Sequence, residues 1–179
     1  MQQSVEVRSA STQFDSDMVV IVFGLPGSGK SYFAVRLAEK LGAEYINSDR
    51  LRKEMFEERT YSDKEKAAVY AGMKKKMHEV LHDSGKLVLD GTFFRKQTRD
   101  EFEQSIANRT VPFFIEMKAT DKIARERLKR KRPFSEADYR VYQIIRSRWE
   151  PMEKPHLVLQ STNENIDDLL NKAMEYLQS

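Results

Sequence analysis

Eight residues near the start of the chain, GLPGSGKS at 24–31, form the stretch with the most specific chemistry. They fit the pattern G-x-x-x-x-G-K-[ST] without a mismatch. Backbone N–H groups of such a loop can wrap a phosphate chain, and a helix that begins there adds about half a positive charge at its N-terminus. Lys30 would reach the β- and γ-phosphates, and the Ser31 hydroxyl would bind Mg²⁺. The stretch therefore predicts a nucleoside triphosphate site.

The residues on either side place this loop between a strand and a helix. An apolar, β-branched run, 18–23 (MVVIVF), enters the loop, and apolar residues recur at spacings of three and four from Phe33 to Leu41. A plain glycine turn is the alternative, but the full pattern in this context arises only rarely by chance. We therefore expect nucleotide contacts from Gly24, Pro26, Gly27, Ser28, Gly29, Lys30, Ser31 and Tyr32.

Strand and helix patterns alternate along residues 18–179, which predicts one α/β domain with a parallel sheet and helices on both faces. The expected strands are 18–23, 44–47, 86–90, 111–117 and 156–160. The later helical patterns are 62–83, 95–107, 121–132, 135–149 and 165–177. Residues 1–17 are predicted to form a disordered polar tail. Ligands of such folds bind at the carboxyl ends of the strands, so the segments that follow the strands are expected to share one site.

Two carboxylates follow apolar strands at that expected rim. Asp90 ends the run 86–90, and a carboxylate there suits the Mg²⁺ shell. Asp49 follows the run 44–47 and could accept a proton from an attacking hydroxyl. The alternatives are a solvated aspartate at a strand end and an ordinary helix N-cap. Arg52 stands one helical turn after Asp49, where it could hold an acceptor phosphate or pair with a carboxylate.

The segment 123–132 (IARERLKRKR) is strongly basic. In a phosphoryl-transfer enzyme, a mobile basic helix can close over the γ-phosphate and neutralise the charge of the transition state. Only some of these side chains share one helix face, and we expect Arg127 and Arg130 to face the site. A solvated basic face or a nucleic-acid patch would explain the same residues.

A rival motif, His78-Glu79-Val80-Leu81-His82, fits the zinc-protease pattern H-E-x-x-H. Two histidines at i and i+4 could bind zinc, with Glu79 as the base. The histidines lie off the apolar stripe of their predicted helix, which indicates a solvated face. A zinc hydrolase is therefore only a remote alternative.

Composition excludes several classes of protein. The 31 Lys and Arg residues against 28 Asp and Glu give a charge of +3, which neither demands nor excludes a nucleic-acid partner. The chain has no cysteine, so it has no disulfide and no thiolate metal site, and a reducing, cytoplasmic location is expected. The longest apolar run is far short of the roughly 20 residues that a membrane helix needs. The N-terminus lacks the pattern of a secretory signal.

Four segments together resemble a known family: GLPGSGKS, SDRLRK, VLDGTFFR and RERLKRKRPFSEAD. They are similar to the P-loop kinases grouped with polynucleotide kinase and zeta toxin, in particular to "predicted kinase" members with an AAA-type ATP-binding label. The resemblance spans about residues 18–160. It implies a three-layer α/β/α P-loop NTPase sandwich with a five-stranded parallel sheet and a helical lid. It also implies that Lys30 and Ser31 hold ATP and Mg²⁺, that Asp49 is the general base, and that Asp90 supports the metal.

The same resemblance implies an acceptor side and a lid. Arg52 would contact the acceptor or its phosphate, and Thr92 and Arg95 would line the same side. Arg127 and Arg130 would be the lid arginines. The extra acceptor-binding segments of members with known specificity are not recognisable in this chain, so the resemblance implies no particular acceptor.

These observations predict an ATP-dependent kinase that transfers the γ-phosphate to a hydroxyl. The expected acceptor is either a 5′-hydroxyl nucleic acid or a small metabolite. An ATP-binding or ATPase module without kinase activity is the alternative. A GTPase switch is disfavoured because the chain has no N-K-x-D motif, since its only Asn-Lys pair, Asn171-Lys172, continues with Ala-Met.

Overall fold

The computed structural model describes residues 17–83 and 85–179, so the predicted polar tail of residues 1–17 lies outside the described residues except for Asp17. Its five strands form one sheet in the order β2-β3-β1-β4-β5, and every neighbouring pair is parallel. The strands are β1 (Met18–Phe23), β2 (Glu44–Asn47), β3 (Lys86–Gly91), β4 (Phe113–Lys118) and β5 (Leu157–Gln160). The predicted α/β fold with a five-stranded parallel sheet is confirmed.

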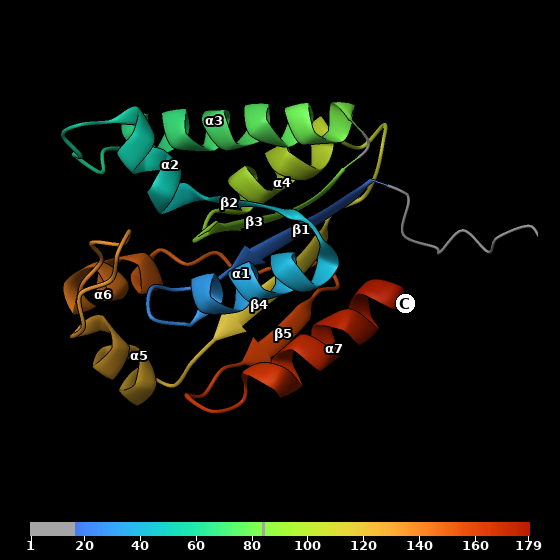
Figure 1. Cartoon of the computed structure of the whole chain (residues 1–179). Helices are drawn as coiled ribbons and strands as arrows, with labels where there is room; N and C mark the ends of the chain where they lie inside the picture. Colours follow the sequence, from blue (N-terminus) through green and yellow to red (C-terminus); the bar gives the residue numbers. More distant parts are fainter. Residues whose placement is uncertain (1–16, 84) are drawn as a thin grey trace, which may run out of the picture.

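Helices cover both faces of the sheet and also gather at one end of it. In the described residues they are α1 (Lys30–Leu41), α2 (Ser48–Met55), α3 (Asp63–His82), α4 (Lys96–Ser105), α5 (Asp121–Leu128), α6 (Tyr139–Ser147) and α7 (Ile166–Gln178). Figure 1 shows α3 and α4 over one face and α1 and α7 over the other. It also shows α5 and α6 beside the arrowheads of the strands, which are their carboxyl ends.

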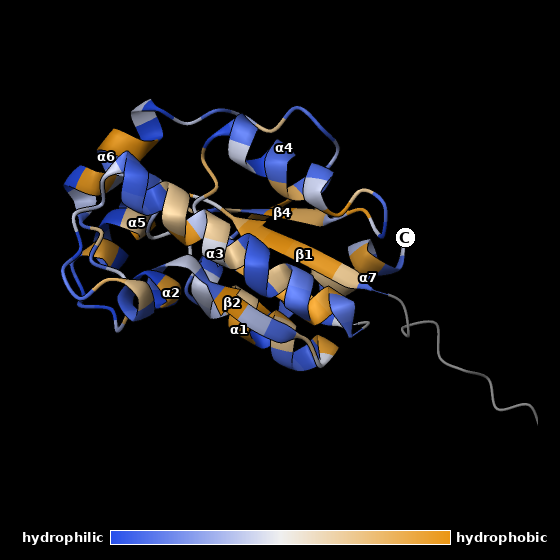
Figure 2. Ribbon diagram, turned by 90° about the horizontal axis from the view of Figure 1, so that it is seen from above, coloured by the Kyte–Doolittle hydropathy of each residue, from blue (hydrophilic) through white to orange (hydrophobic). Residues whose placement is uncertain are grey.

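The central strand β1 explains why the layers form. All six of its residues are buried, and successive side chains point to opposite faces. Val20 and Val22 pack into the core under α1 and α7. Ile21 and Phe23 pack into the second core, under α3 and α4. A strand buried on both faces is apolar without alternation, and Figure 2 shows β1 as a hydrophobic band between helices whose outer faces are hydrophilic.

The basic segment is helical over a shorter range than predicted. Helix α5 ends at Leu128 rather than at residue 132, and α6 begins at Tyr139 rather than at residue 135. Pro133 disfavours helical geometry in the residue before it, and the consecutive cations of 129–132 repel one another. The Asp138 side chain then caps α6 by accepting from the backbone N–H of Val141. Residues 129–138 therefore form a loop that joins the two helices of the lid.

The sheet register brings the predicted site segments to one rim. Asn47 of β2 and Val22 of β1 both pair with Asp90 of β3. The loop after β1, the start of α2 and the loop after β3 therefore leave the sheet side by side. In the part of the chain that the structure describes, no helix is both long and apolar enough to cross a membrane.

Candidate active site

The phosphate-binding loop (P-loop, residues 24–31) is packed tightly against β4 and α5. Gly24 has φ +155°, and a Cβ there would lie 2.3 Å from the Met117 carbonyl oxygen. Gly27 has φ +77°, and a Cβ there would lie 2.9 Å from the Ala124 carbonyl oxygen. Both positions therefore need glycine for conformation and for space. Backbone carbonyl groups of β4 and α5 occupy the space that a side chain would need at these two glycines, and this close packing holds the loop in place.

The Arg127 side chain links the P-loop to the loop that follows β5 by hydrogen bonds. Its Nη1 donates to the Gly27 carbonyl oxygen at 3.2 Å and to Ser161 Oγ at 2.8 Å, and its Nη2 donates to the Thr162 carbonyl oxygen at 2.9 Å. Ser161 Oγ donates to the Ser28 carbonyl oxygen at 2.6 Å. Burial lowers the pKa of the Arg127 guanidinium from its ordinary value. The structure thus places Arg127 between the P-loop and the loop that follows β5.

Lys30 is the first residue of α1 and lies beside the two predicted carboxylates. Its Nζ donates to the Leu25 carbonyl oxygen at 3.5 Å, so the ammonium group lies across the mouth of the P-loop. Burial lowers the pKa of Lys30, and the negative charges of Asp90 and Asp49 oppose that effect. The P-loop lysine and the carboxylates at the ends of β2 and β3 therefore share one electrostatic centre.

Asp90 is fully buried and carries an unsatisfied oxygen. Its Oδ2 accepts from Tyr45 Oη at 2.7 Å and from Asn47 Nδ2 at 2.6 Å. Its Oδ1 is buried and has no hydrogen-bond partner among the described residues. Burial and the Asp90 charge raise the pKa of Tyr45, while the nearby Ser31 hydroxyl has a smaller, opposite effect. A buried, unpartnered carboxylate oxygen beside the P-loop serine fits a hard cation such as Mg²⁺.

Asp49 is half-buried at the start of α2 and is oriented by Arg52. Arg52 Nη1 donates to Asp49 Oδ1 at 2.9 Å, and Arg52 Nε lies 3.0 Å from Glu65 Oε1. Burial raises the pKa of Glu65, but hydrogen bonds from Thr60 and Tyr61 hold it below its ordinary value. The sequence analysis did not select Glu65, because it lies in the charged stretch 62–66 (SDKEK) and no neighbouring residue indicates that its side chain is buried.

The loop after β3 places Thr92 and Arg95 farther along the rim. Phe93 has φ +44°, and its buried ring packs against Tyr70 with ring centres 5.0 Å apart. The Tyr70 hydroxyl hydrogen-bonds to Thr92 and accepts from the backbone N–H of Phe93 at 3.0 Å. Arg95 is more exposed, and its Nη2 lies 3.5 Å from Asp63 Oδ1. The two residues predicted for the acceptor side therefore have different environments: Thr92 lies beside the buried Tyr70, and Arg95 lies at an exposed ion pair.

Arg132, which the sequence analysis did not select, is the arginine of the basic segment that approaches the centre. It interacts electrostatically with Asp49 and with Lys30. Its Nη2 donates to the Ala137 carbonyl oxygen at 2.6 Å, which fixes the loop between α5 and α6. Arg130 is exposed and lies beyond the end of α5. The signal that could have separated Arg132 from the helix is Pro133, because a proline disfavours helical geometry in the residue before it.

The segment 129–138 also contacts the loop between α2 and α3. Lys53 Nζ donates to the Pro133 carbonyl oxygen at 3.0 Å. Arg59 Nη2 donates to Glu136 Oε1 at 2.7 Å, and Tyr61 Oη donates to Glu136 Oε2 at 2.6 Å. Residues 129–138, which we call the lid loop, therefore connect α5 to α2 across the carboxyl ends of the strands.

The chain matches the sequence model of an AAA domain family over residues 19–152. It belongs to this AAA domain family. A comparison with curated proteins finds no match in sequence. The match covers the P-loop, both predicted carboxylates and the whole lid loop.

Solved structures of kinases share the fold of this AAA domain. An unliganded sugar kinase from Janibacter sp. HTCC2649 has a TM-score of 0.71 at 17% identity, over 90% of this chain and 95% of that chain. A gluconokinase from Sinorhizobium meliloti 1021 has a TM-score of 0.67 at 18% identity, over 93% and 98%. An APS kinase from Mycobacterium tuberculosis, solved with AMPPNP and APS, has a TM-score of 0.70 at 20% identity, over 92% and 99%. The chain thus spans nearly the full length of each.

The zinc-protease pattern lies away from this centre, on α3. His78, Glu79 and His82 are all exposed, and His82 Nδ1 lies 3.0 Å from Asp83 Oδ1. Among residues 17–83 and 85–179, no three His, Cys, Asp or Glu side chains are grouped so that they could hold a metal ion. Within the described part of the chain, this motif therefore has no third protein ligand for zinc.

Proposed function

We propose that this AAA domain is an ATP-dependent kinase that transfers the γ-phosphoryl group to a hydroxyl. The observation that carries the proposal is the charge arrangement around Lys30, whose ammonium group interacts with both Asp49 and Asp90. A phosphate-binding cation flanked by a candidate base and a candidate metal ligand is what phosphoryl transfer requires. The kinases that share the fold, which include one solved with AMPPNP, support the same conclusion.

The residues around Lys30 would have separate roles in the reaction. The P-loop N–H groups and Lys30 would hold the β- and γ-phosphates. Asp49 Oδ1 is held by Arg52, which leaves Oδ2 for the acceptor proton. As the acceptor oxygen bonds to the γ-phosphorus, its proton passes to Asp49, and the bond from that phosphorus to the bridging oxygen breaks to leave ADP. Arg132, which interacts electrostatically with Asp49 and Lys30, would stabilise the charge of the transferring group.

Ser31 and Asp90 are the residues that would hold Mg²⁺. When bound, the ion would neutralise phosphate oxygens and help to orient them. The chain contributes the rigid frame: Tyr45 and Asn47 both bind Asp90 Oδ2 and leave its Oδ1 for the ion. The finer placement in the polynucleotide kinase and zeta toxin branch, with a cytoplasmic location, is part of the same proposal.

The test is transfer from ATP labelled on its γ-phosphate to a panel of acceptors. The panel holds a 5′-hydroxyl oligonucleotide, nucleosides, monosaccharides and aminoglycosides, with Lys30→Ala as the blank. Asp49→Asn should lower kcat by roughly 10²- to 10⁴-fold and leave ATP binding unchanged. Asp168→Asn, on the far helix α7, is the matched control and should keep full activity. Full transfer in Asp49→Asn, or label only in free phosphate with every acceptor, would overturn the proposal.

A further inference from the structure

Glu65, in the first turn of α3, is a buried carboxylate to which the proposed reaction assigns no role. Only 4% of the residue is exposed. The segment Ser62-x-x-Glu65 matches a helix capping box, and Ser62 Oγ does accept from the backbone N–H of Glu65 at 3.2 Å. The other half of the box is not formed, because the Ser62 N–H donates to Thr60 Oγ1 at 3.4 Å instead. Helix capping therefore does not explain why this carboxylate is buried.

The two oxygens of Glu65 face different partners. Oε2 accepts from the backbone N–H of Thr60 at 2.6 Å, from Thr60 Oγ1 at 2.9 Å and from the backbone N–H of Tyr61 at 3.1 Å. Tyr61 has φ +54°, which is unfavourable for a residue other than glycine. These bonds therefore stabilise the loop between α2 and α3, residues 56–62, which we call the docking loop. Oε1 lies 3.0 Å from Arg52 Nε, and neither of these two buried atoms has a hydrogen-bond partner among the described residues, so each relies on the opposite charge of the other.

Arg52 connects this carboxylate to the candidate base. Its Nη1 donates to Asp49 Oδ1 at 2.9 Å, and the arginine as a whole is buried. The ring of Tyr61 lies against the guanidinium, with the ring centre 4.7 Å from the central carbon. Without the negative charge of Glu65, the buried guanidinium would lose one of its two carboxylate partners. The position of Arg52, and with it the orientation of Asp49, therefore depends on Glu65.

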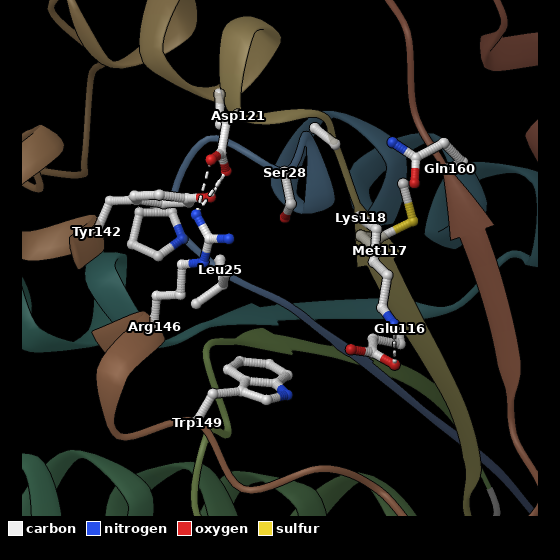
Figure 3. Close-up of a pocket in the computed structure, with 13 residues that line it drawn as sticks. Leu25, Ser28, Glu116, Met117, Lys118, Asp121, Tyr142, Arg146, Trp149 and Gln160 are labelled. Carbon is white, nitrogen blue, oxygen red and sulfur yellow. Dashed lines mark hydrogen bonds and ion pairs between the residues drawn. The ribbon is translucent and has the colours of Figure 1, made fainter. Parts of the chain in front are cut away.

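The docking loop also contacts the lid. In a hollow of about 450 Å³ beside the P-loop, Figure 3 shows Asp121 of α5 facing Tyr142 and Arg146 of α6. Asp121 Oδ1 accepts from Tyr142 Oη at 2.6 Å and from Arg146 Nη1 at 2.8 Å, so the two lid helices are joined. The lid loop between them reaches the docking loop where Tyr61 Oη donates to Glu136 Oε2 at 2.6 Å. The lid therefore docks on the segment that the buried carboxylate of α3 stabilises.

We propose that Glu65 is a positioning residue that couples docking of the lid to orientation of the base. Its Oε2 holds the docking loop, and its Oε1 fixes Arg52, which orients Asp49. The inference rests on the proposed kinase function, because it concerns the base of that reaction. Glu65 acts through Arg52 and would not touch the reacting atoms. When the lid leaves the docking loop, the base is therefore held less firmly.

Glu65→Gln tests the contact with Arg52. The amide oxygen can still accept from the docking loop, but the NH₂ group then faces the Arg52 Nε donor without a charge. We expect kcat to fall by roughly 10- to 100-fold, as for a catalytic group misplaced by about 1 Å, with the KM for ATP and for the acceptor unchanged. Thr60→Val removes one bond to Oε2 but keeps the ion pair, so it is the matched control and should keep full kcat. Asp17→Asn, at the ion pair with Arg109 before β1, controls for the loss of a partly buried charge.

Glu65→Asp tests the link to the lid by a measurement that does not depend on activity. The shorter side chain keeps its charge but cannot hold the docking loop and Arg52 together, so hydrogen exchange of residues 129–138 should accelerate. This variant also covers the case in which Glu65→Gln does not fold, because it should lower kcat in the same way. An unchanged exchange rate of the lid loop would overturn the coupling of the lid to Glu65.

Combining Arg52→Lys with Glu65→Gln shows whether Glu65 acts through Arg52. If it does, the double variant loses no more kcat than Arg52→Lys alone, because both substitutions break the same path. Losses that multiply, an unchanged kcat in Glu65→Gln, or a higher KM for the acceptor with kcat kept would overturn the inference while the kinase function stands. Absence of transfer from the wild type to every acceptor would overturn both the kinase function and this role of Glu65.

Discussion

Arg52 Nη1 donates to Asp49 Oδ1 at 2.9 Å across one turn of α2. The same guanidinium faces the buried carboxylate of Glu65 through Nε, at 3.0 Å, and its centre lies 4.7 Å from the middle of the Tyr61 ring. Arg52 is therefore fixed on three sides and transmits that rigidity to the candidate base. Its contact with Asp49 assigns it a positioning role, in addition to the acceptor contact predicted from the sequence.

Arg52→Lys tests this positioning role. A lysine keeps the charge but cannot bridge two carboxylates with a planar fork, so Asp49 should lose its fixed orientation. We expect kcat to fall by roughly 10- to 100-fold, because misplacing a catalytic group by about 1 Å has such an effect. The KM for ATP should stay unchanged. Steady-state kinetics measure both, and Arg109→Lys, at an ion pair with Asp17, is the control. An unchanged kcat would show that Arg52 does not position the base.

Asp90→Asn tests the metal site. The substitution removes the charge of the unpartnered Oδ1, so the Mg²⁺ concentration needed for half-maximal nucleotide binding should rise by roughly tenfold or more. Binding of ATP without Mg²⁺ should change little. Calorimetric titration of ATP at increasing Mg²⁺ measures both quantities. Asp83→Asn, at the exposed end of α3, is the control. The same Mg²⁺ dependence in wild type and Asp90→Asn would contradict the assignment.

The sheet and the phosphate loop could be predicted from sequence because their causes are local. Runs such as 18–23 are apolar throughout, and the glycine pattern has one well-known geometry. The strand ends then place Asp49 and Asp90 on one rim without any knowledge of packing.

The partners of these residues could not be predicted because they depend on contacts between distant segments. Glu65 reaches Arg52 only because α3 folds back on α2, and Arg127 reaches the P-loop across 100 residues. The end of α5 was also missed, since a helical pattern of charges continues past the point where Pro133 stops it. The sequence analysis selected Arg130, whereas Arg132 is the arginine of the lid loop that interacts electrostatically with both Asp49 and Lys30.

The contact of Glu136 with Arg59 and Tyr61 predicts how the lid loop responds to pH. The hydrogen bonds from Arg59 and Tyr61 lower the pKa of Glu136 from its ordinary value of 4.5 to about 2. The carboxylate therefore stabilises the docked loop fully above about pH 4.5, and this stabilisation is lost as the pH falls toward about 2. We expect hydrogen exchange of residues 129–138, corrected for intrinsic rates, to accelerate over this range.

Glu136→Gln tests the same contact at neutral pH. The pair is exposed and screened by solvent, so its contribution is small and exchange in the lid loop should accelerate by roughly fivefold or less. Glu126→Gln, on the exposed face of α5, should leave the exchange of the loop unchanged. If exchange in Glu136→Gln still accelerated between pH 4.5 and pH 2 as in wild type, another group would be responsible.

Three arginine substitutions separate anchoring from catalysis in the basic segment. Arg127→Lys should weaken ATP binding by roughly tenfold and lower Tm, because a single ammonium cannot replace the fork whose Nη1 binds Gly27 and Ser161 while its Nη2 binds Thr162. Arg132→Ala should instead lower kcat by about 10²-fold with little change in ATP affinity, as expected for a group that stabilises transition-state charge. Arg130→Ala, exposed beyond the end of α5, is the matched control and should change neither quantity strongly. Calorimetry of ATP binding, thermal melts and transfer kinetics measure the three effects. A larger loss of kcat in Arg130→Ala than in Arg132→Ala would restore Arg130 as the lid arginine.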